Sequence, residues 1–337
     1  MTQSIQIFDC AELNSVDHVF VALDRIDARQ IEWHRFSGLP KNTIERAIRR
    51  PRLSRYRAAL GCAVQAAARG DILISHLPLM SGALEVSRLL GLRLPPHLAF
   101  AFNFTELPDG RRRRLLQRAF AGIDQFCVYS AYEIDLYSSF FDLPRPKFKT
   151  VLWTQRPPAV RPIAQTPRMR PFVAAIGYEG RDFACLVATA RKLPNVDFFI
   201  FARPTGLLTA VPDNVAVQFN VPSDEVWGHA LQSHAVLVPL LKETTCCGHI
   251  TIVSAQQHGV PLITTRSHAT REYVEGWQAS CVVEPGDVEG MARSIDRVID
   301  EHEKFVAAAA RDKYHAILKY DRVLWDNYVA DFIRSHL

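Results

Sequence analysis

The segment AVLVPLLKETTCCGHITIVSAQQHGVPLITT, residues 235–265, contains every part of a strand–helix–strand unit. The apolar run at its start predicts a buried strand, and the small and hydroxylated residues after it predict a loop. A helix is expected from residue 249 until Gly259 and Pro261 end it, and a short β-run follows at 262–265. Such a unit predicts parallel strands joined by a crossover helix.

The same alternation continues through both halves of the chain. Strands are expected at 18–23, 71–77, 97–102, 125–130, 172–177, 196–202, 215–219, 235–241 and 280–286. Helices are expected at 53–70, 82–92, 114–123, 130–141, 182–193 and 223–234, with a further helix capped by Asp287. Ser130 and Glu133 have the spacing of a capping box. The pattern predicts an α/β protein with two doubly wound, Rossmann-like domains that face a cleft.

A proline-rich stretch separates the two halves. Residues 154–172 hold five prolines and no apolar periodicity, which predicts a linker at 156–171. The first domain is expected at 1–155 and the second at 172–317. A C-terminal helix at about 318–337 is expected to pack back on the first domain. The 337 residues are enough for two such cores.

Composition narrows the class of protein. Hydrophobic residues make up 48% of the chain and charged residues 22%, which is typical of a soluble globular protein. The seven cysteines form no C-x-x-C pair and are odd in number, so neither a zinc ribbon nor a closed disulfide set is predicted. The N-terminus lacks the features of a signal peptide and no apolar run is long enough to span a membrane, so a cytoplasmic location is expected.

The positive charge is uneven along the chain. Residues 1–155 hold 21 Lys and Arg against 15 Asp and Glu, whereas the remainder holds 19 against 20. The excess is concentrated in RRPRLSRYR (49–57) and RRRR (111–114). Such clusters suit anionic lipid headgroups or a phosphorylated substrate, and the alternative is a solvated basic helix face. Binding to nucleic acid is not expected, because the excess charge is small and no recognition module is evident.

Several common chemistries lack their motifs. The chain has no P-loop, no dinucleotide-binding glycine pattern, no zincin helix and no nucleophile elbow. It has no Asp-x-Asp pair, and its histidines lack the spacing that places two ligands on one helix face. A bound metal is therefore not expected.

The helix start near residue 249 predicts an anion site. Its first turn offers backbone N–H groups and the positive end of the helix dipole, which suit a phosphate or diphosphate. Gly248 allows a ligand to approach the backbone closely, while Thr244, Thr245 and Thr251 offer hydroxyl groups. The alternative is a threonine-rich helix cap that binds no ligand.

Residues 248–265 and YVEGWQASCVVEPGDVEGMARSIDRVI (273–299) carry a family resemblance. They resemble the donor-binding region of GT-B glycosyltransferases, in particular the retaining glycosyltransferase family 4, or glycosyl transferases group 1. FVAAIGYEGRDFACLVATARKLPNVDFFIFA (172–202) is similar to the first strand–loop–helix of that domain. FCVYSAYEIDLYSSFFDLP (126–144) more loosely resembles the acceptor domain, so the resemblance covers roughly 125–300.

The resemblance implies the substrates and the donor-binding residues. A UDP- or GDP-linked sugar would be the donor, with no further cofactor, and a saccharide or lipid-linked acceptor would bind the first domain. Arg181 would face the donor diphosphate, although a surface ion pair with Asp182 or a nearby acid is the alternative for it. The other expected donor-binding residues are Thr245, Gly248, His249, Ile250, Thr251 and Ser254.

This sequence departs from the family at the two glutamates that usually lie eight positions apart. Cys246 and Ser254 occupy those positions, one near the sugar and one near the nucleotide ribose. Serine cannot provide the bidentate grip of a carboxylate. The arginine that commonly follows the first strand of the donor domain is replaced by Tyr178. Cys246 and Cys247 are interpreted as small residues beside a ligand, with a reactive thiolate at the helix start as the alternative.

Three residues are candidates for catalysis in the first domain. Glu106 and Asp109 follow a predicted strand and would supply the base of an inverting reaction. His76 ends the preceding strand and would contact the sugar or the acceptor in a retaining reaction. The alternative for each is a cap or turn residue.

Together these observations predict a cytoplasmic, metal-independent glycosyltransferase at the inner membrane face, with its basic first domain near a lipid-linked or anionic saccharide acceptor and in peripheral contact with an anionic membrane. The resemblance makes synthesis of a cell-surface polysaccharide the expected process. A non-catalytic GT-B protein that binds a sugar nucleotide or glycan is the alternative.

Overall fold

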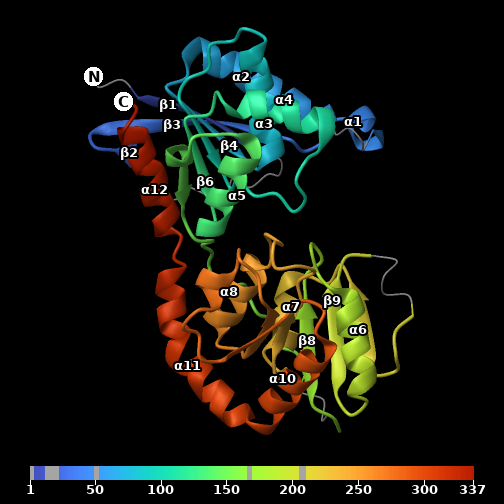
Figure 1. Ribbon diagram of the computed structural model, residues 1–337. Helices are drawn as coiled ribbons and strands as arrows, with labels where there is room; N and C mark the ends of the chain where they lie inside the picture. The colour runs from blue at the N-terminus through green and yellow to red at the C-terminus, as the bar shows by residue number, and fades with distance from the viewer. Residues whose placement is uncertain (1–3, 12–22, 49–52, 165–168, 205–209) are drawn as a thin grey trace. The chain divides into compact units, whose positions relative to one another are not determined.

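The computed structural model of the protein describes residues 4–11, 23–48, 53–164, 169–204 and 210–337 (Figure 1). The chain divides into two compact units. Unit 1 comprises Met1–Leu152 and Arg322–Leu337, and unit 2 comprises Trp153–Asp321. Each unit contains one sheet with helices against it. In the described ranges, no helix combines the length and apolar character needed to cross a bilayer. The predicted cleft between two domains stays a prediction.

The sheet of unit 1 has the order β2-β3-β1-β4-β5-β6-β7, and its neighbouring strands are parallel except for the β2–β3 pair. The strands are β1 (Ile5–Ala11), β2 (Arg25–Ile26), β3 (Arg29–Ser37), β4 (Ile72–His76), β5 (His97–Phe100), β6 (Gln125–Val128) and β7 (Phe148–Thr150). The helices are α1 (Thr43–Ala47), α2 (Leu53–Arg69), α3 (Pro78–Leu89), α4 (Gly110–Phe120), α5 (Ala131–Phe141), the 3-10 turn η1 (Arg145–Lys147) and α12 (Val323–Arg334).

Helices cover both faces of this sheet. Helices α2 to α5 follow one another along one face, because the crossovers from β3 through to β7 all run in the same direction (Figure 1). Helix α12 lies on the other face, where the Trp325 ring packs edge-on against Phe100 at 5.1 Å. Trp325 Nε1 also donates to the Leu152 carbonyl at 2.9 Å.

The start of unit 1 differs from the prediction. Strands β1 and β3 were not predicted, because β1 is a short apolar run interrupted by polar residues and β3 is only half-buried. The strand predicted at 18–23 falls on residues that, up to 22, lie outside the described ones. Helices α3 and α4 begin four residues before the predicted starts. Pro78 is the first residue of α3. An N–H at this position would have no partner within the helix, so proline is tolerated there.

The sheet of unit 2 has the order β10-β9-β8-β11-β12-β13 and is parallel throughout. The strands are β8 (Phe172–Ile176), β9 (Asp197–Ala202), β10 (Val215–Phe219), β11 (Val236–Val238), β12 (Leu262–Thr265) and β13 (Ser280–Val283). The helices are α6 (Phe183–Lys192), α7 (Ser223–Ala230), α8 (His249–His258), α9 (Arg271–Val274), α10 (Val288–Asp300) and α11 (His302–Lys319).

The predicted strand–helix alternation of the second half is confirmed. Helix α10 packs beside α6 on one face of the sheet, and α11 packs beside α8 on the other. Asp287 caps α10 as predicted, its Oδ1 accepting from the Gly290 N–H at 2.8 Å. The strand order changes direction between β8 and β11, which places the topological switch point of this sheet there.

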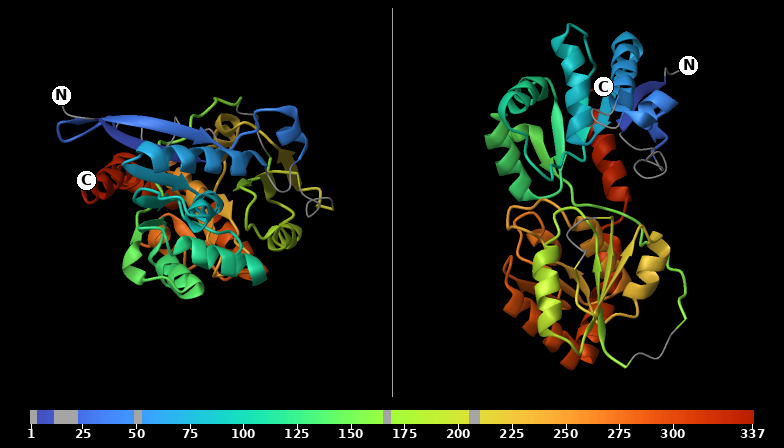
Figure 2. Two further views of the ribbon diagram at one scale, coloured as in Figure 1. Left: turned by 90° about the horizontal axis from the view of Figure 1, so that it is seen from above. Right: turned by 90° about the vertical axis from the view of Figure 1, so that its right-hand side faces the viewer.

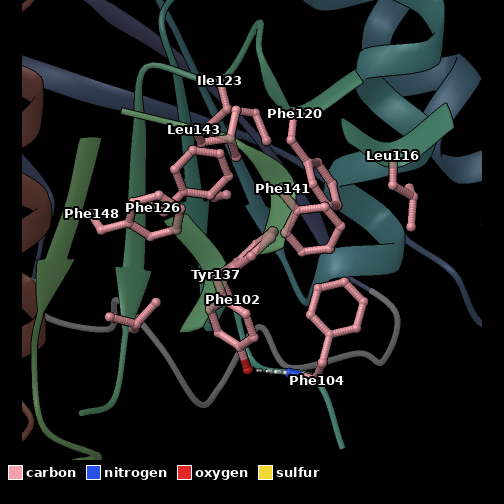
Figure 3. Close-up of a cluster of buried hydrophobic side chains, with 12 residues drawn as sticks. Phe102, Phe104, Leu116, Phe120, Ile123, Phe126, Tyr137, Phe141, Leu143 and Phe148 are labelled. Atoms are coloured by element: carbon pink, nitrogen blue, oxygen red, sulfur yellow. Dashed lines mark hydrogen bonds between the residues drawn. The ribbon is translucent and has the colours of Figure 1, made fainter. Parts of the chain in front are cut away.

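An aromatic cluster fixes the chain where it leaves β5 (Figure 3). The Phe102 ring lies 4.8 Å from the Phe126 ring and 5.0 Å from the Phe120 ring. The Tyr137 hydroxyl accepts a hydrogen bond from the Phe104 N–H at 2.9 Å. Helix α5 thereby holds the start of the loop that carries Glu106 and Asp109.

Glu133 reinforces the same loop from the start of α5. The helix begins after Ser130 as predicted, with the Ser130 side chain as its cap. The buried Glu133 carboxylate accepts from Asn103 Nδ2 at 2.6 Å, from Ser130 Oγ at 2.9 Å and from the Tyr129 N–H at 3.1 Å. Burial raises the pKa of Glu133 to about 7, against the effect of these donors, which favour the carboxylate.

This raised pKa predicts a loss of stability between about pH 4.5 and pH 7. In that window the folded state keeps the proton of Glu133 and the unfolded state has released it, so the free energy of unfolding falls as pH rises. The free energy of unfolding is expected to fall by about 3 kcal/mol, because the pKa of Glu133 is about 7 in the folded state and 4.5 in the unfolded state. Urea unfolding of the wild type and of Glu133→Gln across this range measures it. The difference between the two profiles should change with pH across this window, and a constant difference would contradict the raised pKa of Glu133.

Candidate functional site

The loops after β8 and β11 meet at the switch point of unit 2. An isolated antiparallel bridge joins Arg181 to Leu240. The Leu241 N–H donates to the Gly180 carbonyl at 3.0 Å, and the Asp182 N–H donates to the Pro239 carbonyl at 2.9 Å. In doubly wound sheets this crevice, beyond the carboxyl ends of the strands, is where ligands bind.

Helix α8 starts at this crevice. Its N-cap, Gly248, has φ +101°, a conformation that side-chain-bearing residues rarely adopt. A Cβ at Gly248 would lie 3.3 Å from Val238 Cγ1, so glycine also allows the helix start to sit close to β11. Helix geometry directs the first-turn N–H groups along the axis toward the crevice, where the helix dipole is positive.

Arg181 lies directly against this helix start. Its guanidinium Nη2 donates to Thr251 Oγ1 at 3.2 Å, and its other nitrogens donate to the carbonyls of Ile176 at 3.2 Å and Glu179 at 3.0 Å. The residue is only 7% exposed, and burial lowers the pKa of its guanidinium. Within the described part of the chain it forms no salt bridge, so the ion pair with Asp182 is absent there.

The residues before α8 have structural partners. Thr245 Oγ1 accepts from the Lys242 N–H at 3.2 Å and closes the turn. Cys246 is buried, and Cys247 Sγ lies 3.1 Å from the Glu179 carbonyl. Burial raises the pKa of Cys247, and the nearby Arg181 only partly opposes this. A raised thiol pKa favours the interpretation of Cys247 as a small packing residue over a reactive thiolate.

The side chain of His249 points away from the helix start. Its Nε2 lies 3.0 Å from the Ala269 carbonyl, which makes Nε2 the protonated nitrogen, and its ring packs on Tyr273 at 4.8 Å. Burial lowers the pKa of His249 to about 4, so the imidazole is neutral at neutral pH. His249 can therefore offer a ligand its backbone N–H but no positive charge from its side chain.

Ser254 is fully buried one turn further along α8. Its hydroxyl donates to the Ile250 carbonyl at 2.7 Å and accepts from Gln155 Nε2 at 2.5 Å. Gln155 is itself held in place, since its Oε1 accepts from Trp153 Nε1 at 2.7 Å and its carbonyl accepts from Gln257 Nε2 at 2.8 Å. The half-buried Gln155 side chain thus covers Ser254.

A second group of polar residues lies at the switch point of unit 1, between β1 and β4. His76 ends β4, and its Nε2 lies 2.7 Å from Asp9 Oδ1 on β1. Both side chains are largely buried. Leu77, which follows His76, has φ +71°, and Ala101 after β5 has φ +54°. Non-glycine residues in this region are strained, and such strain clusters at functional sites.

Glu106 and Asp109 lie in the loop after β5, and both are exposed. Asp109 is the N-cap residue of α4, but its side chain makes no capping hydrogen bond. This loop and His76 follow neighbouring strands at the same edge of the sheet. In the described ranges no group of three or more His, Cys, Asp or Glu side chains could hold a metal ion, and metal independence stays a prediction.

Comparison with known families identifies the domain around the α8 site. Residues 187–301 match the family model described as Glycosyl transferases group 1. Unit 2 carries a glycosyl transferases group 1 domain. The predicted resemblance is thus confirmed for the residues of this glycosyltransferase domain. Comparison with the curated proteins gave no match.

Solved structures of glycosyltransferases share the whole fold. Sucrose-phosphate synthase from Thermosynechococcus elongatus is 11% identical, with 98% of each chain covered and a TM-score of 0.72. Anabaena Alr3699/HepE in complex with UDP-glucose is 12% identical, with 90% of this chain and 86% of that chain covered and a TM-score of 0.68. The lipopolysaccharide outer core galactosyltransferase WaaB is 12% identical, with coverage of 99% and 100% and a TM-score of 0.68. These similarities confirm the predicted GT-B fold.

Within unit 2, the structure brings most of the predicted donor-binding residues together at one place. Arg181, Gly248 and Thr251 meet at the start of α8, with His249 and Ile250 in its first turn. Thr245 lies in the loop before the helix, and Ser254 lies beneath Gln155. His76, Glu106 and Asp109 belong to unit 1. The roles of all these residues stay predictions.

Two residues at these sites were missed by the sequence analysis. Asp9 lies in β1, which was not predicted. A carboxylate within an apolar run was the sequence signal that could have marked Asp9 as a site residue. Gln155 lies in the proline-rich stretch and carried no signal, because only the fold brings it onto Ser254.

Gly180 is expected to be a poorly replaceable glycine of unit 2. It has φ +63°, and a Cβ there would lie 2.6 Å from Cys247 Sγ and 2.7 Å from Thr245 Cγ2. Gly180→Ala should lower the free energy of unfolding by about 2–4 kcal/mol, from backbone strain and overpacking together. Gly276→Ala is the matched control, because Gly276 has φ +80° and nothing within 4 Å of its added Cβ. Urea unfolding that gives equal losses for the two variants would contradict the close contact.

Proposed function

We propose that this chain transfers a glycosyl group from a nucleotide-diphosphate-sugar to a saccharide or lipid-linked acceptor without a metal ion. Unit 2 would hold the donor diphosphate between Arg181 and the first turn of α8. The backbone N–H groups of Gly248, His249 and Ile250 and the hydroxyl groups of Thr245 and Thr251 would surround it.

One observation carries this proposal: Arg181 is a buried cation that forms no salt bridge in the described residues, and the Glu179 carboxylate acts on it only from beyond salt-bridge distance. A buried charge is expensive unless it is paired, and carbonyl oxygens compensate it only in part. The crevice beside Arg181 also receives the positive end of the α8 dipole. Two positive features at a topological switch point fit an anionic ligand, and a diphosphate has the matching charge.

The same features would assist the chemistry. As the glycosidic bond to the donor breaks, negative charge grows on the departing nucleotide diphosphate. Arg181 and the helix start are fixed before the reaction, so they stabilise that charge without reorganisation. Neither feature requires a metal ion.

For the acceptor side, the observations favour His76 over Glu106 and Asp109. The Asp9 carboxylate fixes the His76 ring, and two strained residues lie beside it: Leu77 follows His76 in the chain, and Ala101 follows Phe100, which pairs with His76 in the sheet. We assign His76 to contact with the transferred sugar or the acceptor hydroxyl, and Asp9 to positioning His76. Glu106 and Asp109 remain the candidates for a base if the reaction inverts the anomeric centre.

The proposed setting of the reaction is supported by a protein of similar fold. WaaB is a lipopolysaccharide outer core galactosyltransferase, which supports a role in making a cell-surface polysaccharide. We place the protein in the cytoplasm at the inner membrane face, where a lipid-linked acceptor would be reached. HepE binds UDP-glucose, so UDP-sugars are the first donors to test and GDP-sugars the second.

A thermal-shift panel tests the donor site. UDP, GDP and other nucleoside diphosphates are added to the full chain, and at least one should raise its Tm, because a ligand that binds only the folded state stabilises it. The corresponding nucleotide sugar should then be hydrolysed slowly when no acceptor is present. If no nucleotide changes the Tm, the proposed donor site is wrong.

A non-catalytic sugar-nucleotide binder is the second candidate. It is favoured by the absence of both family glutamates, since Cys246 and Ser254 are buried and neither can act as a carboxylate. A binder would show the Tm shift but no nucleotide release from any nucleotide sugar, even with a saccharide acceptor panel. Turnover of one nucleotide sugar would exclude this candidate.

A further inference from the structure

Helix α2 carries a stripe of exposed apolar side chains on its outer side. Leu53, Tyr56, Leu60 and Val64 are all exposed, and their spacing of three, four and four residues puts them on one side of the helix. The opposite side packs into unit 1 through Ala58, Ala59, Cys62, Ala63 and Ala66. A helix that needs one apolar face to fold therefore has a second one facing outward.

Helix α1 extends this exposed apolar surface. Ile44 and Ile48 are exposed at α1, and Leu39 is exposed just before it. Arg57 on α2 ties the two parts together, because its Nε donates to Glu45 Oε1 at 2.7 Å and its Nη2 donates to the Leu39 carbonyl at 2.9 Å. Figure 2 shows α2 on the outer side of unit 1 in both views.

The exposed charges that the segment between Leu39 and Arg69 contributes to this surface have one sign. Between Leu39 and Arg69 the sequence contains a single acidic residue, Glu45. Its carboxylate is buried and is occupied by Arg57 and the Lys41 N–H. Lys41, Arg46 and Arg69 are exposed around the stripe. No exposed carboxylate therefore lies between Leu39 and Arg69 in the described ranges, so the surface combines apolar side chains with positive charge.

We propose that the outer side of α1 and α2 docks on an anionic lipid surface. The stripe is a narrow ridge on a helix, and a bilayer can accept such a ridge at the boundary between headgroups and acyl chains. The surrounding lysine and arginine side chains can reach lipid phosphates while their aliphatic parts lie along the apolar region. The inference rests on the proposed function in one respect, which is that a lipid-linked acceptor lies on such a surface.

Vesicle co-sedimentation of the full chain tests this surface. Vesicles of phosphatidylcholine with phosphatidylglycerol should bind the protein at least tenfold more strongly than vesicles of phosphatidylcholine alone. Added salt should weaken the binding, because headgroup attraction is screened. The variant Tyr56→Ser/Leu60→Ser should reduce binding to the anionic vesicles at least tenfold.

Helix α11 offers a matched control for the double variant. Tyr314 and Leu318 have the same residue types and the same four-residue spacing as Tyr56 and Leu60. They are 70% and 53% exposed, against 54% and 57% for the α2 pair. Tyr314→Ser/Leu318→Ser should bind vesicles as the wild type does. Circular dichroism of both variants checks that each is folded.

Three results would overturn the inference: no binding of the wild type to anionic vesicles, unchanged binding of the α2 variant, or equal loss in both variants. A wild-type dimer that the α2 variant converts to a monomer would instead identify the surface as a contact between two copies. The nucleotide Tm shift is measured on the same samples. If no nucleotide shifts the Tm but the protein binds anionic vesicles, only the proposed function is refuted. If a nucleotide shifts the Tm but the protein does not bind anionic vesicles, only the lipid surface is refuted.

Discussion

Arg181→Ala is expected to lower kcat/KM for nucleotide-sugar turnover by about a hundredfold to a thousandfold, the range found when one preorganised donor to a developing negative charge is removed. Arg181 is buried against the first turn of α8, where water cannot easily replace the lost charge. The same change should abolish the Tm shift caused by the matching nucleoside diphosphate. Release of that diphosphate from its sugar conjugate is the measurement of turnover.

Two further variants separate the charge of Arg181 from its geometry. Arg181→Lys keeps the positive charge, but an ammonium group cannot span the acceptors at Ile176, Glu179 and Thr251, so part of the loss should remain. Arg191→Ala removes an exposed arginine from α6 in the same unit and should leave turnover unchanged. Wild-type turnover by a folded Arg181→Ala protein would show that the diphosphate binds elsewhere.

His76→Ala is expected to lower kcat by about a hundredfold or more, the lower range for loss of a group that handles a proton or orients the reacting atoms. His76 is held by Asp9 at 2.7 Å, so its ring is fixed before substrate binds. Nucleotide binding should be unaffected, because the proposed donor residues belong to unit 2. Single-turnover release of nucleotide and the Tm shift measure the two effects separately.

Asp9→Asn and the loop carboxylates test this assignment. Asp9→Asn keeps the size of the side chain and should lower kcat about tenfold through His76. Combining it with His76→Ala should therefore add little, since residues that act as one unit are not additive. Glu106→Ala and Asp109→Ala should each have a smaller effect than His76→Ala. A larger loss in either would identify a base and point to an inverting reaction.

The surroundings of Ser254 give a structural reason for the absence of a glutamate at this position. The sequence predicts that the Ser254 side chain lies near the nucleotide ribose and offers it a hydroxyl group in place of a carboxylate. In the structure its hydroxyl lies beneath the Gln155 amide and bonds to the Ile250 carbonyl. The space that a longer side chain at 254 would enter is thus taken by a residue from the stretch before β8.

Predictability differed between the two units for a physical reason. The strands of unit 2 and its helices α6, α7, α8 and α10 were predicted because each strand is apolar and short, and caps such as Asp287 mark helix starts within a few residues of sequence. Strands β1 and β3 were missed because their patterns are weak. Their pairing with each other and with β4 stabilises them, and that pairing joins residues far apart in the chain.

The sequence by itself determined the alternating α/β architecture, the helix start at Gly248 and the family of the domain in unit 2, because those signals lie within short, continuous segments. Only the tertiary structure decided that Arg181 is buried against Thr251, that Asp9 holds His76 and that Gln155 covers Ser254. These pairs are 70, 67 and 99 residues apart. Contacts over such separations depend on strand order and on the direction of each crossover, which no local pattern of residues specifies. The exposed stripe on α2 was also decided only by the tertiary structure. The helical spacing of its apolar residues is visible in the sequence, but which side of the helix stays uncovered depends on the fold.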